Sequence, residues 1–245
     1  MAQINNTTVN PWNNLIKVEN DKIIAECDLA YITKEYGSLS QYESFINDKY
    51  EEAELTFDCL PEPYSGNPES KVYCLNKNPG KPDSCFNDDQ SFKDATILNL
   101  QLKSKSSFWA ENLKNRCGKQ HDGVGWLKTR TNKLEEILNG HPDIFFIEYF
   151  PYHSSKGFKF PKDLPSYKFT DTLIEQAMKE GKLIIIMREK KGWLDRIEGL
   201  KDYPNLYCLN CAQGGYLTPN NIVRIDKNGD KHHLSENEIK KYFKL

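Results

Sequence analysis

Short apolar runs alternate with segments of helical periodicity in the second half of the chain. Runs typical of buried strands lie at 71–75, 144–150, 183–187 and 206–209. Apolar residues at helical spacing fill the intervals between them, at 126–138, 170–179 and 193–200. This alternation predicts an α/β protein with a three-layer α/β/α architecture, in which helices cover both faces of a central, mostly parallel, four-stranded sheet.

The C-terminal part of the chain carries a different pattern. Asn228-Gly229 separates the apolar run 222–225 from a run that starts at Lys231, which predicts a β-hairpin. Ser235 and Glu238 then have the spacing of a capping box that opens a last helix.

The first 60 residues are less regular. The segment 39–50 is typical of a helix capped by Ser40, whereas 23–31 fits either a helix or a strand. In the core, Thr170 or Asp171 is placed to cap the helix that ends at 179. No linker rich in Gly, Ser or Pro separates the parts, so we expect a single domain. Its parts are an N-terminal extension packed on the core (1–60), the core itself (61–221), and the hairpin with the C-terminal helix (222–245).

Composition excludes several classes of protein. No apolar run approaches the roughly 18–20 residues of a membrane span, and the N-terminus is neither basic nor apolar, unlike a secretory signal. Seven cysteines, an odd number, fit reduced thiols better than a disulfide framework. We therefore expect a cytoplasmic protein that does not associate with a membrane.

The net charge of −2 hides an uneven distribution. Residues 1–70 hold 4 Lys against 13 Asp and Glu, so the rest of the chain is net basic. Within 103–133, only Glu111 and Asp122 oppose the basic residues Lys103, Lys105, Lys114, Arg116, Lys119, Lys128, Arg130 and Lys133. This cluster either neutralises the phosphates of a nucleic acid or pairs with the acidic extension.

The loops that follow the predicted strands are the best candidates for a site, because open parallel sheets bind ligands at the carboxyl ends of their strands. The first and the last of these loops, 76–80 and 210–221, are rich in Asn, Gln, Gly and Pro, which turn the backbone and present amide groups. Glu148 and His153 lie at the end of the second strand. Either could contact a base, and either could be purely structural.

The first loop carries a resemblance to a known family. Leu60-Pro61-Glu62-Pro63-Tyr64-Ser65-Gly66-Asn67, then a strand, then Asn76-Lys77-Asn78-Pro79-Gly80, resembles the lead-in and first motif of the uracil-DNA glycosylase superfamily. Some members have Gly-x-Asn-Pro-Gly there, so only Asn76 departs. The resemblance implies hydrolysis of an N-glycosidic bond in DNA without a cofactor, with Asn78 positioning the attacking water. An amide suits that role, since positioning matters more than strong base catalysis when the sugar becomes oxocarbenium-like.

The second motif of the family follows the last strand, typically as His/Asn-Pro-Ser-Pro, and stabilises the leaving base. The matching segment is Asn210-Cys211-Ala212-Gln213-Gly214-Gly215, where Asn210 fits and histidine is absent; Leu217-Thr218-Pro219-Asn220 is a second match. Phe86 could stack on an extruded base. The candidate catalytic residues are therefore Asn78, Asn210 and Gln213, and the candidate binding residues are Asn76, Pro79, Gly80, Phe86, Glu148, His153, Thr218 and Asn220.

Two alternatives stay open. The degenerate second motif and the acidic extension also fit a non-catalytic member of the same fold that binds nucleic acid or a protein. An unrelated α/β enzyme acting on a small substrate through His153 and Glu148 is the other. No metal site is expected, because Cys208-x-x-Cys211 lacks further ligands at a suitable spacing.

Overall fold

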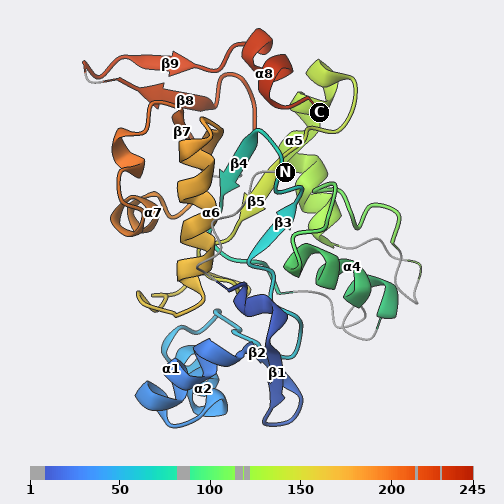
Figure 1. Cartoon of the computed structure of the whole chain (residues 1–245), viewed down its shortest axis with the longest axis vertical. Coiled ribbons are helices and arrows are strands. Elements are labelled where there is room, and N and C mark those ends of the chain that lie inside the picture. The colour runs from blue at the N-terminus through green and yellow to red at the C-terminus, as the bar shows by residue number, and fades with distance from the viewer. Residues whose placement is uncertain are drawn as a thin grey trace.

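The computed structural model describes residues 9–81, 89–113, 118, 122–212, 215–226 and 228–244. It contains a seven-stranded mixed sheet in the order β3-β5-β4-β6-β7-β8-β9 (Figure 1). The four strands at its centre run parallel: β4 (Val72–Leu75), β5 (Phe145–Ile147), β6 (Leu183–Ile186) and β7 (Leu206–Leu209). The predicted α/β class is confirmed.

The sheet is larger than the predicted four strands. β8 (Ile222–Ile225) pairs antiparallel with β7, and β9 (Lys231–His233) with β8, so the predicted hairpin extends the sheet. β3 (Tyr64–Gly66) adds an antiparallel strand at the other edge. Its three residues lie between prolines and show no alternation. Gly66 has φ +113°, and a Cβ there would lie 2.4 Å from the Ile144 carbonyl oxygen, so this edge requires glycine.

Alternate residues of the central strands face opposite helical layers. Tyr73 and Leu75 of β4 pack in one apolar cluster with α6, whereas Val72 and Cys74 pack in a second cluster with α5 and α8. All four β4 residues are buried, as expected for a parallel strand covered on both faces. The helices thus lie on both sides of the sheet, which supports the three-layer arrangement.

The helices flank the sheet and build most of the extension. They are η1 (Pro11–Asn13), α1 (Glu26–Tyr36), α2 (Leu39–Lys49), α4 (Gln90–Leu100), α5 (Asp122–Leu138), α6 (Tyr167–Lys179), α7 (Lys190–Arg196), η2 (Leu200–Asp202) and α8 (Glu236–Tyr242). The capping box of Ser235 and Glu238 opens α8 as predicted. Among the described residues, no helix has both the length and the apolar character needed to cross a membrane.

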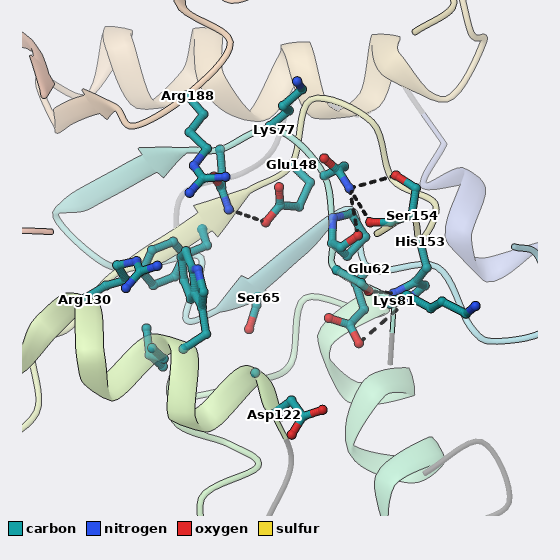
Figure 2. Close-up of a pocket in the computed structure, with 18 of the residues that line it drawn as sticks. Glu62, Ser65, Lys77, Lys81, Asp122, Arg130, Glu148, His153, Ser154 and Arg188 are labelled. Atoms are coloured by element: carbon teal, nitrogen blue, oxygen red, sulfur yellow. Dashed lines mark hydrogen bonds and ion pairs between the residues drawn. The ribbon is translucent and has the colours of Figure 1, made fainter. Parts of the chain in front are cut away.

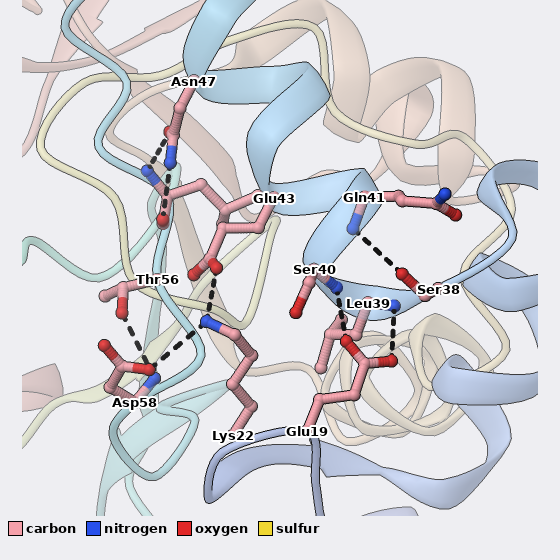
Figure 3. Close-up of polar contacts among 11 residues, drawn as sticks. Glu19, Lys22, Ser38, Leu39, Ser40, Gln41, Glu43, Asn47, Thr56 and Asp58 are labelled. Carbon is pink, nitrogen blue, oxygen red and sulfur yellow. Dashed lines mark hydrogen bonds and ion pairs between the residues drawn. The ribbon is translucent and has the colours of Figure 1, made fainter.

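Two predicted caps are wrong. α6 begins at Tyr167, so Thr170 lies inside it, where its buried hydroxyl donates to the Tyr167 carbonyl. α2 is capped by Ser38, whose Oγ accepts a hydrogen bond from the Gln41 backbone N–H, and not by Ser40 (Figure 3). Ser38 and Ser40 both fit the capping pattern of α2, and backbone geometry selects Ser38. At α6 the N-cap position is Ser166, whose side chain makes no capping hydrogen bond.

The N-terminal extension packs against the segment that follows β5. It begins with the hairpin of β1 (Leu15–Val18) and β2 (Lys22–Ala25), so the ambiguous segment 23–31 is a strand up to Ala25 and a helix from Glu26. The ring of Tyr152 lies 4.8 Å from that of Phe57, and its hydroxyl donates to buried Asp28 at 2.7 Å. Apolar residues of the extension belong to the same cluster as α6.

Strand order identifies where a ligand would bind. The chain passes from β4 to β5 on one side of β4 and then crosses to β6 on its other side. Such a reversal opens a crevice at the carboxyl ends of the strands, because the loops after them diverge there. The loops after β4, β5 and β6 all reach this position.

Candidate functional site

A cleft of about 760 Å³ opens at this position (Figure 2). One side is formed by the loop after β4, by Glu148 after β5 and by Arg188 after β6. The other side is the N-terminal half of α5 together with Trp109. The cleft therefore lies between the sheet edge and one helical layer.

Most of the predicted site residues that the structure describes meet in this cleft. The ones that line it are Asn76, Asn78, Pro79, Gly80, Glu148 and His153. They come from two loops separated by about 70 residues of sequence and brought together by the parallel pairing of β4 and β5. Phe86 and Gln213 lie outside the described residues.

Of the predicted residues after β7, the three that the structure describes do not line the cleft. Asn210 is exposed and its Oδ1 accepts a hydrogen bond from Lys231 Nζ at 2.8 Å, while Thr218 and Asn220 do not line the cleft. Asn221 explains this placement, because its side chain bonds the Cys211 N–H and carbonyl and the Tyr216 carbonyl. Asn221 thereby links the two ends of the loop.

Asn78 is held in one orientation. Its Nδ2 lies 2.9 Å from Ser154 Oγ, 3.0 Å from the Ser154 carbonyl oxygen and 2.9 Å from the Pro79 carbonyl oxygen. Carbonyl oxygens only accept, so these contacts fix which end of the amide is nitrogen. The Oδ1 accepts no hydrogen bond from any described residue and remains as a fixed acceptor in the cleft.

Glu148 is a neutral acid at neutral pH. Its Oε1 accepts a hydrogen bond from Asn76 Nδ2 at 3.0 Å, and its Oε2 is buried without a partner among the described residues. Burial, with a smaller contribution from nearby Glu62, raises the pKa of Glu148 to about 8, against the opposing effects of Asn76, Arg188 and His153. Since Oε1 already accepts, the proton belongs on Oε2, which makes that oxygen a donor.

His153 is a cation held by the backbone. Its Nδ1 lies 2.6 Å from the Gly80 carbonyl oxygen and its Nε2 lies 2.9 Å from the Leu60 carbonyl oxygen. Both partners only accept, so both ring nitrogens must donate. Burial opposes the cation, but Cys59, Glu62 and the Gly80 carbonyl outweigh it and raise the pKa of His153 to about 10. Neither nitrogen is left to contact a base, and His153 instead ties the loop after β4 to the lead-in.

Aromatic rings form the wall opposite this polar edge. Trp109, Trp126 and Phe146 line the cleft, and Trp109 Nε1 donates to Ser65 Oγ at 2.8 Å. Trp126 packs edge-on against Phe146, with ring centroids 6.1 Å apart. Aromatic faces bind planar rings of any heterocycle. Neither tryptophan was predicted to be a site residue, although both lie within the basic segment 103–133, which was an available signal.

Charges around the cleft are partly paired by the extension. Lys81 lies 3.6 Å from Glu54, and Lys156 pairs with Glu52. The acidic extension therefore pairs with lysines of the cleft rim. Lys128, from the predicted basic cluster, pairs instead with Glu111 at 2.7 Å.

From that cluster, Arg130 lines the cleft. Lys114, Arg116 and Lys119 lie outside the described residues. Within the described part of the chain, no group of three or more His, Cys, Asp or Glu is arranged to hold a metal ion.

Comparison with known proteins adds no family assignment. No protein-family model, curated protein or solved structure matches the chain. Function is therefore inferred from the cleft and its chemistry.

Proposed function

We propose that the protein binds a nucleobase of DNA in this cleft and removes it by hydrolysing the N-glycosidic bond, in the manner of the uracil-DNA glycosylase superfamily. The observation that carries the proposal is the fixed acceptor of Asn78 in the same cleft as the Glu148–Asn76 pair. Asn78 is suited to hold the water, and the Glu148–Asn76 pair is suited to hold the base.

The polar edge favours a base with a carbonyl beside an N–H group. Protonated Glu148 offers a donor once a small rotation of its side chain brings the buried Oε2 to the surface of the cleft. Asn76 Oδ1, which accepts no hydrogen bond from the described residues, offers an acceptor. Uracil, hypoxanthine and xanthine present that arrangement, whereas cytosine and adenine carry an amino group in place of the carbonyl. An aromatic wall of Trp109 and Trp126 would stack on the ring.

Hydrolysis requires little proton transfer from the water. As the bond between the sugar C1′ and the base nitrogen breaks, its electron pair leaves with the base, and a water held by Asn78 Oδ1 adds to C1′. A hydrogen bond from Glu148 to the base carbonyl would stabilise the negative charge that develops there. The water loses one proton to solvent and keeps the other as the new C1′ hydroxyl, and the departing base anion takes up a proton from solvent.

Single-turnover incubation with oligonucleotides containing uracil, hypoxanthine or xanthine tests the proposal. The wild type is expected to release the base, and Asn78→Ala to release it about a hundredfold more slowly, since a mispositioned nucleophile costs roughly that factor. Asn132→Ala makes the same change at an exposed site of α5 away from the cleft and should keep full activity. Absence of release above background by the wild type would refute the catalytic part.

One observation favours a non-catalytic alternative. The described part of the loop after β7 places no predicted donor for a leaving base in the cleft. A protein of this kind would bind the same oligonucleotides, or a protein partner, without turnover. Fluorescence anisotropy beside the release assay separates the two functions, because binding without Asn78-dependent release supports the alternative.

A further inference from the structure

Two arginines enter the cleft, and neither has an acidic partner among the residues that the structure describes. Arg130 comes from α5 and Arg188 directly follows β6, and Figure 2 shows both side chains on the side of the cleft away from His153. Among the described residues, neither guanidinium makes a hydrogen bond or a salt bridge. Lys77, by contrast, has Glu189 at 4.0 Å, and the other two lysines of the rim pair with the extension.

Arg130 packs against two aromatic rings. Its guanidinium lies 5.5 Å from the Trp126 ring centroid and 5.0 Å from that of Tyr216. Gly215, at φ +66°, brings the backbone so close that a Cβ there would lie 3.6 Å from Arg130 Nε. Nε is buried without a partner, so the terminal Nη groups are the donors that remain for a ligand. Packing against aromatic rings restricts the guanidinium group and so reduces the conformational entropy that it loses when a ligand binds.

We propose that Arg130 and Arg188 together bind a phosphate group of the ligand. A planar guanidinium donates two parallel hydrogen bonds to phosphate oxygens, and a tetrahedral phosphate has enough oxygens to accept from both walls at once. A nucleotide whose base lies against Trp126 would carry its phosphate close to Arg130. The inference rests on the proposed function only in taking the ligand to be a nucleotide.

Two sources share this chemistry, the monoester of a free nucleotide and the diester of a DNA strand. Binding to deoxyuridine, its 5′- and 3′-monophosphates and a single-stranded oligonucleotide containing deoxyuridine distinguishes them. Quenching of tryptophan fluorescence reports occupancy, since Trp109 and Trp126 line the cleft. Variants are Arg130→Gln, Arg130→Lys and Arg188→Gln.

Lys133→Gln provides the matched control. Lys133 lies on the same helix, is exposed, pairs with Glu136, and does not line the cleft. Its replacement removes one positive charge from α5 without touching the proposed site. Far-UV circular dichroism establishes that each variant is folded.

We expect a phosphate-bearing ligand to bind the wild type at least tenfold more tightly than deoxyuridine at low salt, as charged hydrogen bonds allow. Arg130→Gln and Arg188→Gln should each reduce that advantage, Arg130→Lys should retain more of it than Arg130→Gln, and Lys133→Gln should retain all of it. A preference for the oligonucleotide over both monophosphates identifies the diester as the source. Equal binding of nucleoside and nucleotides to the wild type overturns the proposal, as does an equal loss in Arg130→Gln and Lys133→Gln.

Pyrophosphate separates this inference from the proposed function. If pyrophosphate binds the wild type and not Arg130→Gln while no nucleoside binds, the phosphate site stands and nucleobase binding fails. The opposite outcome is that deoxyuridine binds, but the arginines add nothing to the binding of pyrophosphate, the nucleotides or the oligonucleotide. In that case nucleobase binding stands and the phosphate site fails.

Discussion

Glu148 makes base binding dependent on pH. With a pKa of about 8, the Glu148 carboxyl group is protonated in roughly nine-tenths of the molecules at pH 7 and in about one-tenth at pH 9. A ligand that accepts its hydrogen bond from the Glu148 hydroxyl should therefore bind about tenfold less tightly at pH 9. Glu148→Gln replaces the hydroxyl with an amide N–H that donates at every pH, so its affinity should not follow this titration.

Binding of deoxyuridine to both proteins, followed by tryptophan fluorescence from pH 6.5 to 9, measures the effect. Titration of the ligand itself is common to both proteins and cancels in their ratio. The wild-type affinity divided by that of Glu148→Gln should fall about tenfold between pH 7 and pH 9. A ratio that stays constant would refute the assignment of a protonated Glu148 as the donor.

Stability provides a second readout of the same proton. Glu148 ionises near pH 4.5 in the unfolded chain and near pH 8 in the folded protein, so the folded protein holds the proton more tightly. Stability should therefore fall, relative to Glu148→Gln, as pH rises from about 4.5 to 8, and then stay level. Urea unfolding at pH 5 and pH 8 tests this, with Glu198→Gln, at an exposed position after α7, as a control that should keep the wild-type slope.

Two further predictions concern the contacts that hold the cleft and the extension. Because the pKa of His153 is raised, its stabilising contribution is complete below about pH 6.5 and is lost as pH rises through about 10. The difference in unfolding free energy between wild type and His153→Ala should therefore shrink over that range. A difference that does not depend on pH would contradict a cationic His153. Tyr152→Phe removes a donor to buried Asp28 and should cost about 1–3 kcal/mol in urea unfolding. Tyr42→Phe removes a buried hydroxyl that has no hydrogen-bond partner in the described part of the chain, and it should cost less. Equal costs would show that the bond to Asp28 contributes nothing.

The central strands and the first loop were predictable because their signal is local. β4 is a short apolar run ended by Asn-Pro-Gly, and a strand buried on both faces shows no polar interruption. Knowledge that the strands are parallel then suffices to bring Asn78, Glu148 and His153 to one edge of the sheet. The strand β3 has only three residues between prolines, so no periodicity could reveal it.

The roles of individual side chains were less predictable because they depend on distant backbone groups. His153 looks like a donor to a ligand until the carbonyl groups of Leu60 and Gly80 occupy both its nitrogens. Loop 210–221 has the composition of a binding loop, yet the Asn221 side chain bonds backbone groups of Cys211 and Tyr216, and Asn210 accepts from Lys231. Composition indicates that a loop is polar, and only its path determines where those groups point.

The charge of the cleft follows from two protonation states that are the reverse of those in solution. At neutral pH the acid Glu148 is neutral, because it is buried without a cationic hydrogen-bond partner. The base His153 is charged, because hydrogen-bond acceptors surround its ring. Arg130 and Arg188 add two unpaired positive charges within the same cleft. A chain with a net charge of −2 thus presents a positive cleft, since its surplus acids lie mainly in the first 70 residues. Field lines from such a cleft favour an anionic ligand over a neutral one, so the overall charge of the protein gives no argument against nucleic acid.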